Sequence, residues 1–238
     1  MRPIGGVLGR TVNATGYTSS GIWSLADAQR ERGAYNWPGV PPIPGYIGWY
    51  TGESFSGSTW TDRSGNGNNA TVTRGTVSVV TTTGNGARNS FLALQGGTGD
   101  GIQFPAAILP STWTLFHVTR YNGTRQRILT GISNNWLSGH WSGATGVAFH
   151  EGWLTGQPDN HANAWVLSTD QLNLYRSNKV TRGTSNGTQS TRLSVNAGVN
   201  SEYSDWQCAE IIVYNTALSV NDYTATEEYL TQKYGLAN

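Results

Sequence analysis

The sequence predicts an all-β fold, a jelly-roll β-sandwich of two antiparallel sheets with one C-terminal helix. First, only 12% of the 238 residues are charged, against a usual ~25%, while glycine, tryptophan and tyrosine are plentiful. Second, short runs rich in Val, Ile, Thr and aromatic residues are separated by clusters of Gly, Asn, Asp and Ser, which is typical of strands and turns. Third, the runs 113–118 and 211–214 are apolar on both faces, as expected of central strands in stacked sheets.

The strand pattern begins at residue 45, so we expect one large β-domain over residues 45–238, a length that suits a single all-β domain. Its expected strands are residues 46–51, 69–74, 76–82, 90–95, 113–121, 126–132, 146–154, 162–168, 172–176, 192–196 and 205–214.

Residues 1–44 read as an N-terminal arm. Ser24 is a good N-cap for a short helix over residues 25–32, which Gly33 would end. The four prolines in residues 37–44 favour a stiff polyproline II strut. The arm either packs on its own domain or docks that domain onto a larger assembly.

One helix is expected near the C-terminus. Ser219 is its predicted N-cap, with Asp222 three residues on, and Gly235 is its predicted terminator. Its inward stripe, with Glu227 at the edge, is expected to consist of Tyr223, Glu227, Leu230 and Tyr234.

Composition argues against several classes of partner. The net charge is +1 and no basic stripe is visible, so we expect no nucleic-acid partner. No apolar run reaches the ~18–20 residues of a membrane span, and no signal peptide is visible, so we expect synthesis in a cytoplasm and no membrane contact. The single cysteine, Cys208, is expected to be a small buried hydrophobe, and the neighbouring Glu210 to pair with an arginine or with backbone donors.

The turn over residues 62–68 offers oxygen ligands in a small space. Asp62, Asn66 and Asn68 are candidate ligands for a weak structural Ca²⁺ site. Calcium takes six to eight oxygens, yet this turn holds one carboxylate. The alternative is an Asx-turn, with Asp62 and Asn66 bonded to their own backbone and with two glycines at positive φ. Histidine and cysteine are too sparse for zinc.

The segment over residues 134–159 is the richest in the side chains that bind sugars. Such sites pair an exposed aromatic face with a few planar amides or carboxylates. The alternative is that its tryptophans belong to the sandwich core; if one is exposed, Trp141 or Trp153 is favoured, because both lie near glycine-rich turns. The candidate carbohydrate-binding residues are Trp141, Trp153, His150, Asp159 and Asn160.

No catalytic constellation is visible in the sequence. Glycosidases need two carboxylates across the scissile bond. Glu227 and Glu228 are adjacent on a helix, and Glu151 and the neighbouring His150 are expected to point to opposite faces of a strand. We therefore expect no enzymatic activity and no catalytic residue.

Several segments resemble a known family. Trp60-Thr61-Asp62-Arg63-Ser64-Gly65-Asn66-Gly67-Asn68 is similar to the opening turn of concanavalin A-like (laminin G-like) domains, and residues 209–236 resemble their closing strand and helix. Residues 21–38 and 135–153 resemble segments found in proteins of phages and large algal viruses. The resemblance implies a concanavalin A-like lectin fold, which in some relatives holds a structural Ca²⁺ and in others carries glycosidase activity.

The resemblance also implies a role. We expect a virion structural protein (a fibre, spike or capsid decoration) whose lectin-like domain binds host glycans. Residues 1–44 would contact other virion proteins, and the chain would form a homo-oligomer. The alternatives are a purely structural decoration or assembly protein without a ligand, and a glycoside hydrolase.

Overall fold

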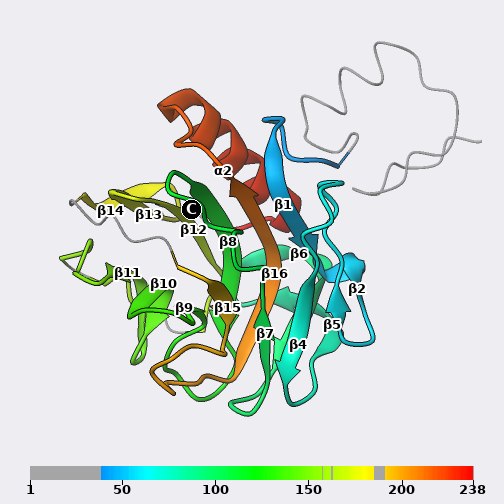
Figure 1. Ribbon diagram of the computed structural model, residues 1–238. Helices are drawn as coiled ribbons and strands as arrows, with labels where there is room; N and C mark the ends of the chain where they lie inside the picture. Colours follow the sequence, from blue (N-terminus) through cyan, green and yellow to red (C-terminus); the bar gives the residue numbers. More distant parts are fainter. Residues whose placement is uncertain (1–38, 157, 162, 185–190, 238) are drawn as a thin grey trace, which may run out of the picture. The chain divides into compact units, whose positions relative to one another are not determined.

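The computed structural model describes residues 39–156, 158–161, 163–184 and 191–237 (Figure 1). The chain divides into two units, Met1–Pro44 and Gly45–Asn238. The expected helix over residues 25–32 lies outside the described residues, as does the start of the expected strut. Of that strut, residues 39–44 are described, and they contain bends without a helix or a strand.

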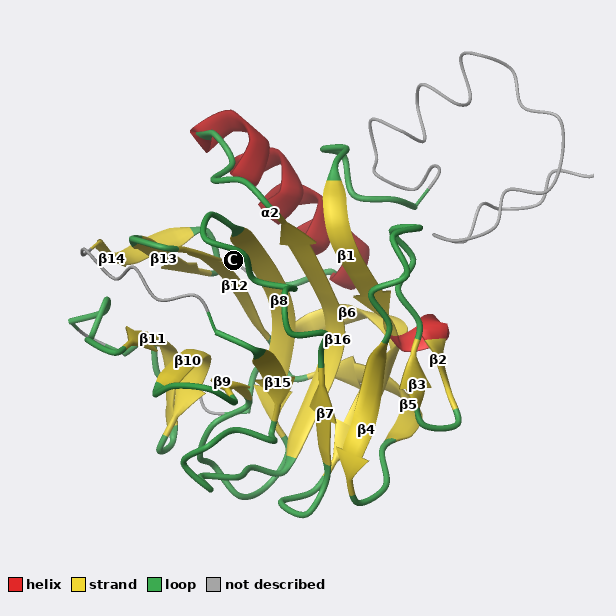
Figure 2. Cartoon of the chain, viewed as in Figure 1, coloured by secondary structure: helices red, strands yellow, loops and turns green. Residues whose placement is uncertain are grey.

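The second unit contains two antiparallel sheets of eight strands each (Figure 2). In the first sheet, β1 (Tyr46–Thr51) pairs with β16 beside the main strand path. That path is β14 (Val180–Thr184), β13 (Leu174–Ser177), β12 (Val166–Gln171), β8 (Thr114–Tyr121), β16 (Trp206–Tyr214), β6 (Ala87–Gly96) and β5 (Ser78–Gly84).

The second sheet faces the first across the core. Its order is β11 (Ala144–His150), β10 (Trp136–Trp141), β9 (Leu129–Gly131), β15 (Leu193–Val195), β7 (Gly101–Gln103), β4 (Ala70–Arg74), β3 (Thr59–Trp60) and β2 (Phe55–Ser56). A 3-10 turn, η1 (Gly52–Ser54), precedes β2. Two stacked antiparallel sheets and a C-terminal helix confirm the predicted fold class.

Strands β8 and β16 are buried along their whole length, as their two apolar faces predict. Leu115, Ile211 and Val213 lie in the core between the sheets. The opposite face carries the cross-strand pair Phe116 and Ile212. Helix α2 (Val220–Tyr234) packs on both β6 and β12, the strands that flank β8 and β16, so it covers this outer face.

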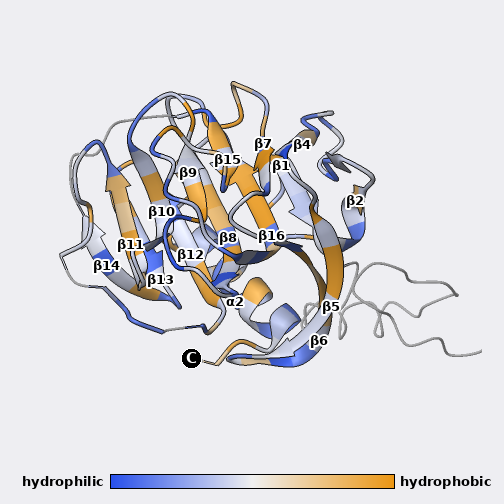
Figure 3. Ribbon diagram, turned by 90° about the horizontal axis from the view of Figure 1, so that it is seen from below, coloured by the Kyte–Doolittle hydropathy of each residue, from blue (hydrophilic) through white to orange (hydrophobic). Residues whose placement is uncertain are grey.

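The core is rich in aromatic side chains. Figure 3 shows the apolar residues concentrated on the central strands, among them β8, β15 and β16. Cys208 is fully buried in this core, which confirms its expected role. The fully buried tryptophans are Trp60, Trp113, Trp136 and Trp206.

Helix α2 begins and ends where the sequence predicts. The Ser219 side chain accepts a hydrogen bond from the Asp222 backbone N–H, and Gly235 adopts a left-handed conformation with φ 61°. The expected position of Glu227 at the edge of the stripe is wrong, because its side chain is fully buried. The helix lies over β12 and β13, where the Glu227 carboxylate accepts hydrogen bonds from Thr169 and Arg176.

Glu210 also has partners other than those predicted. Its carboxylate accepts hydrogen bonds from the Trp49 indole (2.6 Å), the Lys233 ammonium (2.5 Å) and the Tyr234 hydroxyl, rather than from an arginine or the backbone. Glu210 lies on the face of β16 that α2 covers, so its carboxylate is in contact with Lys233 and Tyr234 of the helix. In the described part of the chain, no helix has the length and apolar character needed to span a membrane.

Candidate functional site

Two tryptophans stand apart from the core. Six of the eight tryptophans in the described residues are buried, whereas Trp153 is 46% exposed and Trp141 is partly exposed. The two indole rings are in edge-to-face contact, with centroids 5.2 Å apart and planes at 64°. Trp141 and Trp153 are the two tryptophans that the sequence favoured for exposure.

The β10–β11 hairpin positions Trp141. Its turn is formed by Ser142 and Gly143, both at positive φ (48° and 86°), so that Trp141 pairs directly with Ala144. Further along the hairpin, Gly139 pairs with Val147 and His140 pairs with Thr145, which leaves Gly146 unpaired as a β-bulge. Because of this extra residue, Ala144 and Val147 lie on one face although they are three positions apart.

The segment after β11 positions Trp153. The chain reverses at Glu151 (φ 57°), which is why the strand expected over residues 146–154 ends at His150. It then runs back beside β11: Trp153 forms a bridge with Phe149, and the Leu154 N–H donates to the Ala148 carbonyl at 3.0 Å. The Ala148 N–H in turn donates to the Thr155 hydroxyl at 3.3 Å. These bonds fix Trp153 above Val147.

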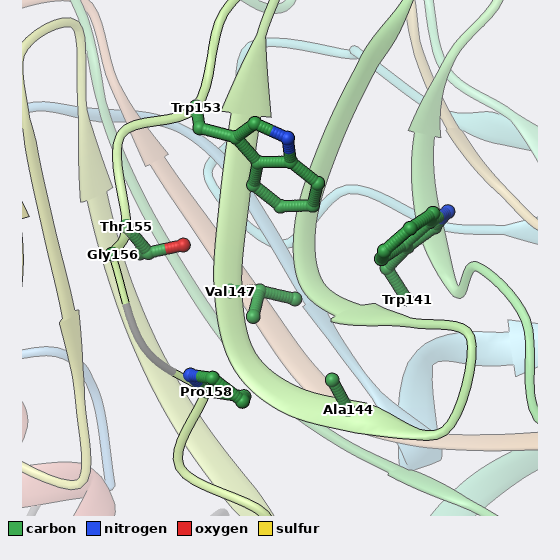
Figure 4. Close-up of a pocket in the computed structure, with 7 residues that line it drawn as sticks. All are labelled: Trp141, Ala144, Val147, Trp153, Thr155, Gly156 and Pro158. Atoms are coloured by element: carbon green, nitrogen blue, oxygen red, sulfur yellow. The ribbon is translucent and has the colours of Figure 1, made fainter.

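The hairpin and the returning segment enclose an open pocket of about 330 Å³, within the size range of small-ligand sites. Figure 4 shows Val147 and Ala144 on β11, between Trp141 on one side and the segment with Thr155 and Pro158 on the other. The pocket is lined by Trp141, Ala144, Val147, Trp153, Thr155, Gly156 and Pro158. Aromatic walls and an aliphatic floor suit the C–H face of a sugar ring.

The other predicted sugar-binding residues do not line this pocket. His150 is buried; its ring stacks on Trp136, with centroids 5.0 Å apart, and its Nε2 lies 3.2 Å from the Asp170 carboxylate. The carboxylate of Asp159 is paired with Arg182 and with His161 (2.8 Å), and it accepts a hydrogen bond from Ser177.

Asn160 is exposed and has a positive φ of 47°. Trp141 and Trp153, the two tryptophans that the sequence favoured if one is exposed, line the pocket, whereas His150, Asp159 and Asn160 have structural contacts or positions outside the pocket lining.

The turn over residues 62–68 is arranged as a hydrogen-bonded turn. Asp62 Oδ1 accepts from the backbone N–H groups of Trp49 and Ser64, and Oδ2 accepts from the Ser64 hydroxyl and the Asn68 N–H. The Ser64 N–H bond to Asp62 closes an Asx-turn, and Gly65 and Gly67 have positive φ as predicted. This network occupies the carboxylate that calcium would need most.

The side-chain amides of this turn are also hydrogen-bonded within the protein. The Asn66 Nδ2 donates to the Tyr46 carbonyl at 3.3 Å, and the Asn68 Nδ2 donates to the Ile47 carbonyl at 2.8 Å. The Asn66 amide thus donates to the Ser64 hydroxyl (2.9 Å) and to β1 rather than to its own backbone. A weak Ca²⁺ site at Asp62, Asn66 and Asn68 stays a prediction, since calcium takes six to eight oxygens and these residues supply one carboxylate and two amide oxygens.

A second, polar pocket of about 300 Å³ lies where the ends of β5 and β6 meet the loops that follow β6 and β8. Asp100 and Asp205 lie close together there, because one oxygen of each lies within 3.5 Å of the position that a Gly97 Cβ would occupy. Sequence reasoning missed this pair, since only the fold brings the two residues together. The lining residues are Thr76, Ser78, Gln95, Gly96, Gly97, Asp100, Asn122 and Asp205.

Backbone donors hold both carboxylates in place. The N–H groups of Thr76 (2.9 Å) and Gly97 (2.7 Å) donate to Asp100. The N–H groups of Thr98 (3.1 Å) and Thr124 (2.7 Å) donate to Asp205. The hydrogen bond from the Thr124 backbone is the main cause of a lowered pKa of Asp205, which is therefore ionised at neutral pH.

These features define the chain's second unit as a two-sheet antiparallel β-sandwich with an aromatic pocket at one sheet edge. No protein-family model matches the chain. No curated protein sequence matches it either.

Among solved structures, the chain is similar to domain 4 of a GH43 extracellular arabinanase from Geobacillus stearothermophilus, solved in complex with arabinotriose. That match has a TM-score of 0.57 and 14% identity, and it covers 78% of this chain and 98% of that one. Trypanosoma rangeli sialidase, in complex with the inhibitor DANA, matches with a TM-score of 0.52 and 15% identity over 82% of this chain and 34% of the sialidase.

The binding domain of botulinum neurotoxin DC, in complex with SialylT, matches with a TM-score of 0.50 and 12% identity. The match covers 80% of this chain and 52% of that one. The chain thus spans about a third of the sialidase and about half of the toxin domain. At these identities the likeness establishes the fold.

The comparison corrects one expectation. From the lack of a visible carboxylate pair we expected no enzyme, but two of these three structures belong to an arabinanase and a sialidase. The expectation also assumed that a catalytic pair must be close in sequence. Asp100 and Asp205 show that loops far apart in the chain can bring two carboxylates to one pocket.

Proposed function

We propose that the second unit is a carbohydrate-binding domain whose aromatic pocket receives the C–H face of a sugar ring. The observation that carries this proposal is the pair Trp141 and Trp153, held in edge-to-face contact at the rim of a pocket while six other tryptophans are buried. An exposed indole pair on a rigid hairpin presents a large apolar surface to a ligand at a small entropic cost.

The solved structures support the proposal by analogy of fold. The arabinanase domain was solved with arabinotriose, and the toxin binding domain with SialylT. These ligands belong to those proteins, but they provide the first probes for this chain.

Glycan-array binding of the full chain, compared with Trp153→Ala and Trp141→Ala, tests the proposal. The array should include arabino-oligosaccharides and sialylated glycans. We expect at least one glycan class to bind, and each substitution to weaken that binding by ~1–3 kcal/mol, the size of a lost aromatic contact in a small pocket. Val220→Ala, at an exposed residue at the start of α2, is the control and should bind as the wild type does.

The finer expectation, a fibre, spike or capsid decoration that contacts host glycans, rests on sequence resemblance alone. If the chain binds no glycan on the array, that result would favour the alternative of a decoration or assembly protein without a ligand. Light scattering on the purified chain measures the proposed homo-oligomer, and pull-down of assembly partners with and without residues 1–44 tests the proposed docking arm.

One observation favours a second candidate function, glycoside hydrolysis at the polar pocket. Asp100 and Asp205 both lie beside Gly97, and the ionised Asp205 suits the role of base or nucleophile. Release of reducing ends from oligosaccharides, abolished in both Asp100→Asn and Asp205→Asn, would establish this activity. Release that persists in both variants would exclude this pair from the chemistry.

A further inference from the structure

The lining of the aromatic pocket has an unusual chemical balance for a sugar site. None of its seven residues carries a charge, and apart from the two indoles only Thr155 has a polar side chain. Ala144 and Val147 form an aliphatic floor between the walls (Figure 4). A sugar hydroxyl on this floor would lose its hydrogen bonds to water without replacement. A methyl group would instead gain from burial there.

The polar side chain on the described floor and walls of this pocket is that of Thr155, and its hydroxyl can donate. The Thr155 hydroxyl accepts a hydrogen bond from the Ala148 N–H at 3.3 Å, so its own proton remains available to a ligand. A ligand therefore needs an acceptor, such as a carbonyl oxygen, next to its apolar group.

We infer that the aromatic pocket selects an uncharged N-acetylated amino sugar, with the acetamido methyl on the Ala144–Val147 floor and the acetamido carbonyl accepting from Thr155. This inference rests on the proposed carbohydrate-binding function and names the ligand class of that same site. An acetamido group combines, on one substituent, the methyl and the acceptor that this lining calls for.

The surrounding charges support an uncharged ligand. The nearest ion pair along the chain is Asp159 with Arg182, and the Arg182 guanidinium also donates to Ser177, so this cation is already engaged. The described lining of the pocket offers no cation to a uronic acid and no carboxylate to a free amino sugar. The preference therefore arises from the acetyl group and not from charge.

Isothermal titration calorimetry of the full chain with three methyl β-glycosides tests this inference. The probes are those of N-acetylglucosamine, glucose and glucosamine, which differ only at the 2-position. We expect the N-acetylated compound to bind about tenfold more tightly than the other two, from a buried methyl group and one additional hydrogen bond.

Two isosteric variants locate the selectivity. Val147→Thr replaces one floor methyl by a hydroxyl. Thr155→Val removes the donor, together with the acceptor of the Ala148 N–H, while keeping the shape of the side chain. Each should reduce the N-acetyl preference, taken as the ratio of the N-acetylglucosamine and glucose affinities of the same variant, to about twofold or less. Val220→Thr makes the same chemical change at an exposed residue and should keep the full preference.

The outcomes separate the inference from the proposed function. Equal affinity for N-acetylglucosamine and glucose, with both lost in Trp153→Ala, would overturn the inference and leave carbohydrate binding intact. Tighter binding of a 6-deoxy sugar than of N-acetylglucosamine would overturn it in the same way. If no saccharide binds on the array or in the titration, the proposed function fails and the inference fails with it.

Discussion

Two histidines, His117 and His140, are fully buried between the sheets. His117 contacts the hydroxyls of Thr119 (2.9 Å) and Ser138 (3.1 Å), and the His140 ring packs edge-on against Tyr121. Burial lowers the pKa of His140 to about 3, and burial together with the proximity of His140 lowers that of His117 well below its usual value. Both rings are therefore neutral in the folded protein at mildly acidic pH.

This burial predicts acid sensitivity. Below pH ~6.5 the unfolded chain protonates both histidines while the folded chain does not, so stability present above pH ~6.5 is lost as the pH falls. Each histidine should contribute a slope of about 1.4 kcal/mol per pH unit, which for His140 continues down to its folded pKa of about 3. Urea denaturation between pH 7 and 4 measures this slope. His140→Leu should reduce the slope by the contribution of one histidine, about 1.4 kcal/mol per pH unit. A free energy of unfolding independent of pH over this range would contradict the burial of both rings.

At the residue scale, the sequence predicted the surface tryptophans better than their polar neighbours. Trp141 and Trp153 lie beside glycine-rich turns, where large side chains reach the surface, and that local signal identified them. His150 looks equally suitable in the sequence, but it points into the core, where Trp136 and Asp170 surround it. Only the sheet packing decides which of two adjacent polar residues faces inward.

At the element scale, the β-bulge at Gly146 shapes the pocket. Gly146 has a φ of 70°, and a Cβ on it would lie 2.4 Å from the Asp159 Cβ. Gly143, in the turn of the same hairpin, also has positive φ (86°), but nothing lies within 4 Å of the position of its Cβ. A side chain at Gly143 would therefore cause backbone strain alone, whereas a side chain at Gly146 would add a steric clash.

This pair gives a matched prediction. Gly143→Ala should destabilise the fold by about 1 kcal/mol, the strain of a left-handed non-glycine residue, and leave sugar binding intact. Gly146→Ala adds the clash with Asp159 and should destabilise by ~3 kcal/mol or more while also weakening sugar binding. Thermal unfolding and glycan binding of both variants provide the test. Equal stability of the two variants would mean that the bulge is not packed as described.

The predictability of the elements followed the strength of their local signals. The limits of α2 were evident from Ser219 and Gly235, and β1 was predicted residue for residue. The short strands β2, β3 and β7 were missed, because two or three residues carry no periodic pattern. Strand β10 was missed as well, although its Trp136-Leu137 start is buried, because its serine and glycine residues resemble a turn.

At the scale of the whole molecule, the sandwich joins segments that are distant in sequence. The final strand β16 lies between β8 and β6 and also pairs with the first strand β1, so the centre of the first sheet forms only when both ends of the unit meet. Local patterns predicted two sheets, but not this strand order. The polar pocket with Asp100 and Asp205 is formed by segments that are far apart in the sequence, so no local motif indicates it.

The proposed function places a sugar between Trp141 and Trp153. The most direct measurement is NMR of the indole Nε1–H resonances of the ¹⁵N-labelled full chain, assigned by single Trp→Phe variants, during titration with a glycan identified on the array. The resonances of Trp141 and Trp153 should shift in a saturable way, while that of the buried Trp60 stays constant. Glycan binding that leaves both of these resonances unchanged, or shifts only those of core tryptophans, would contradict the claim.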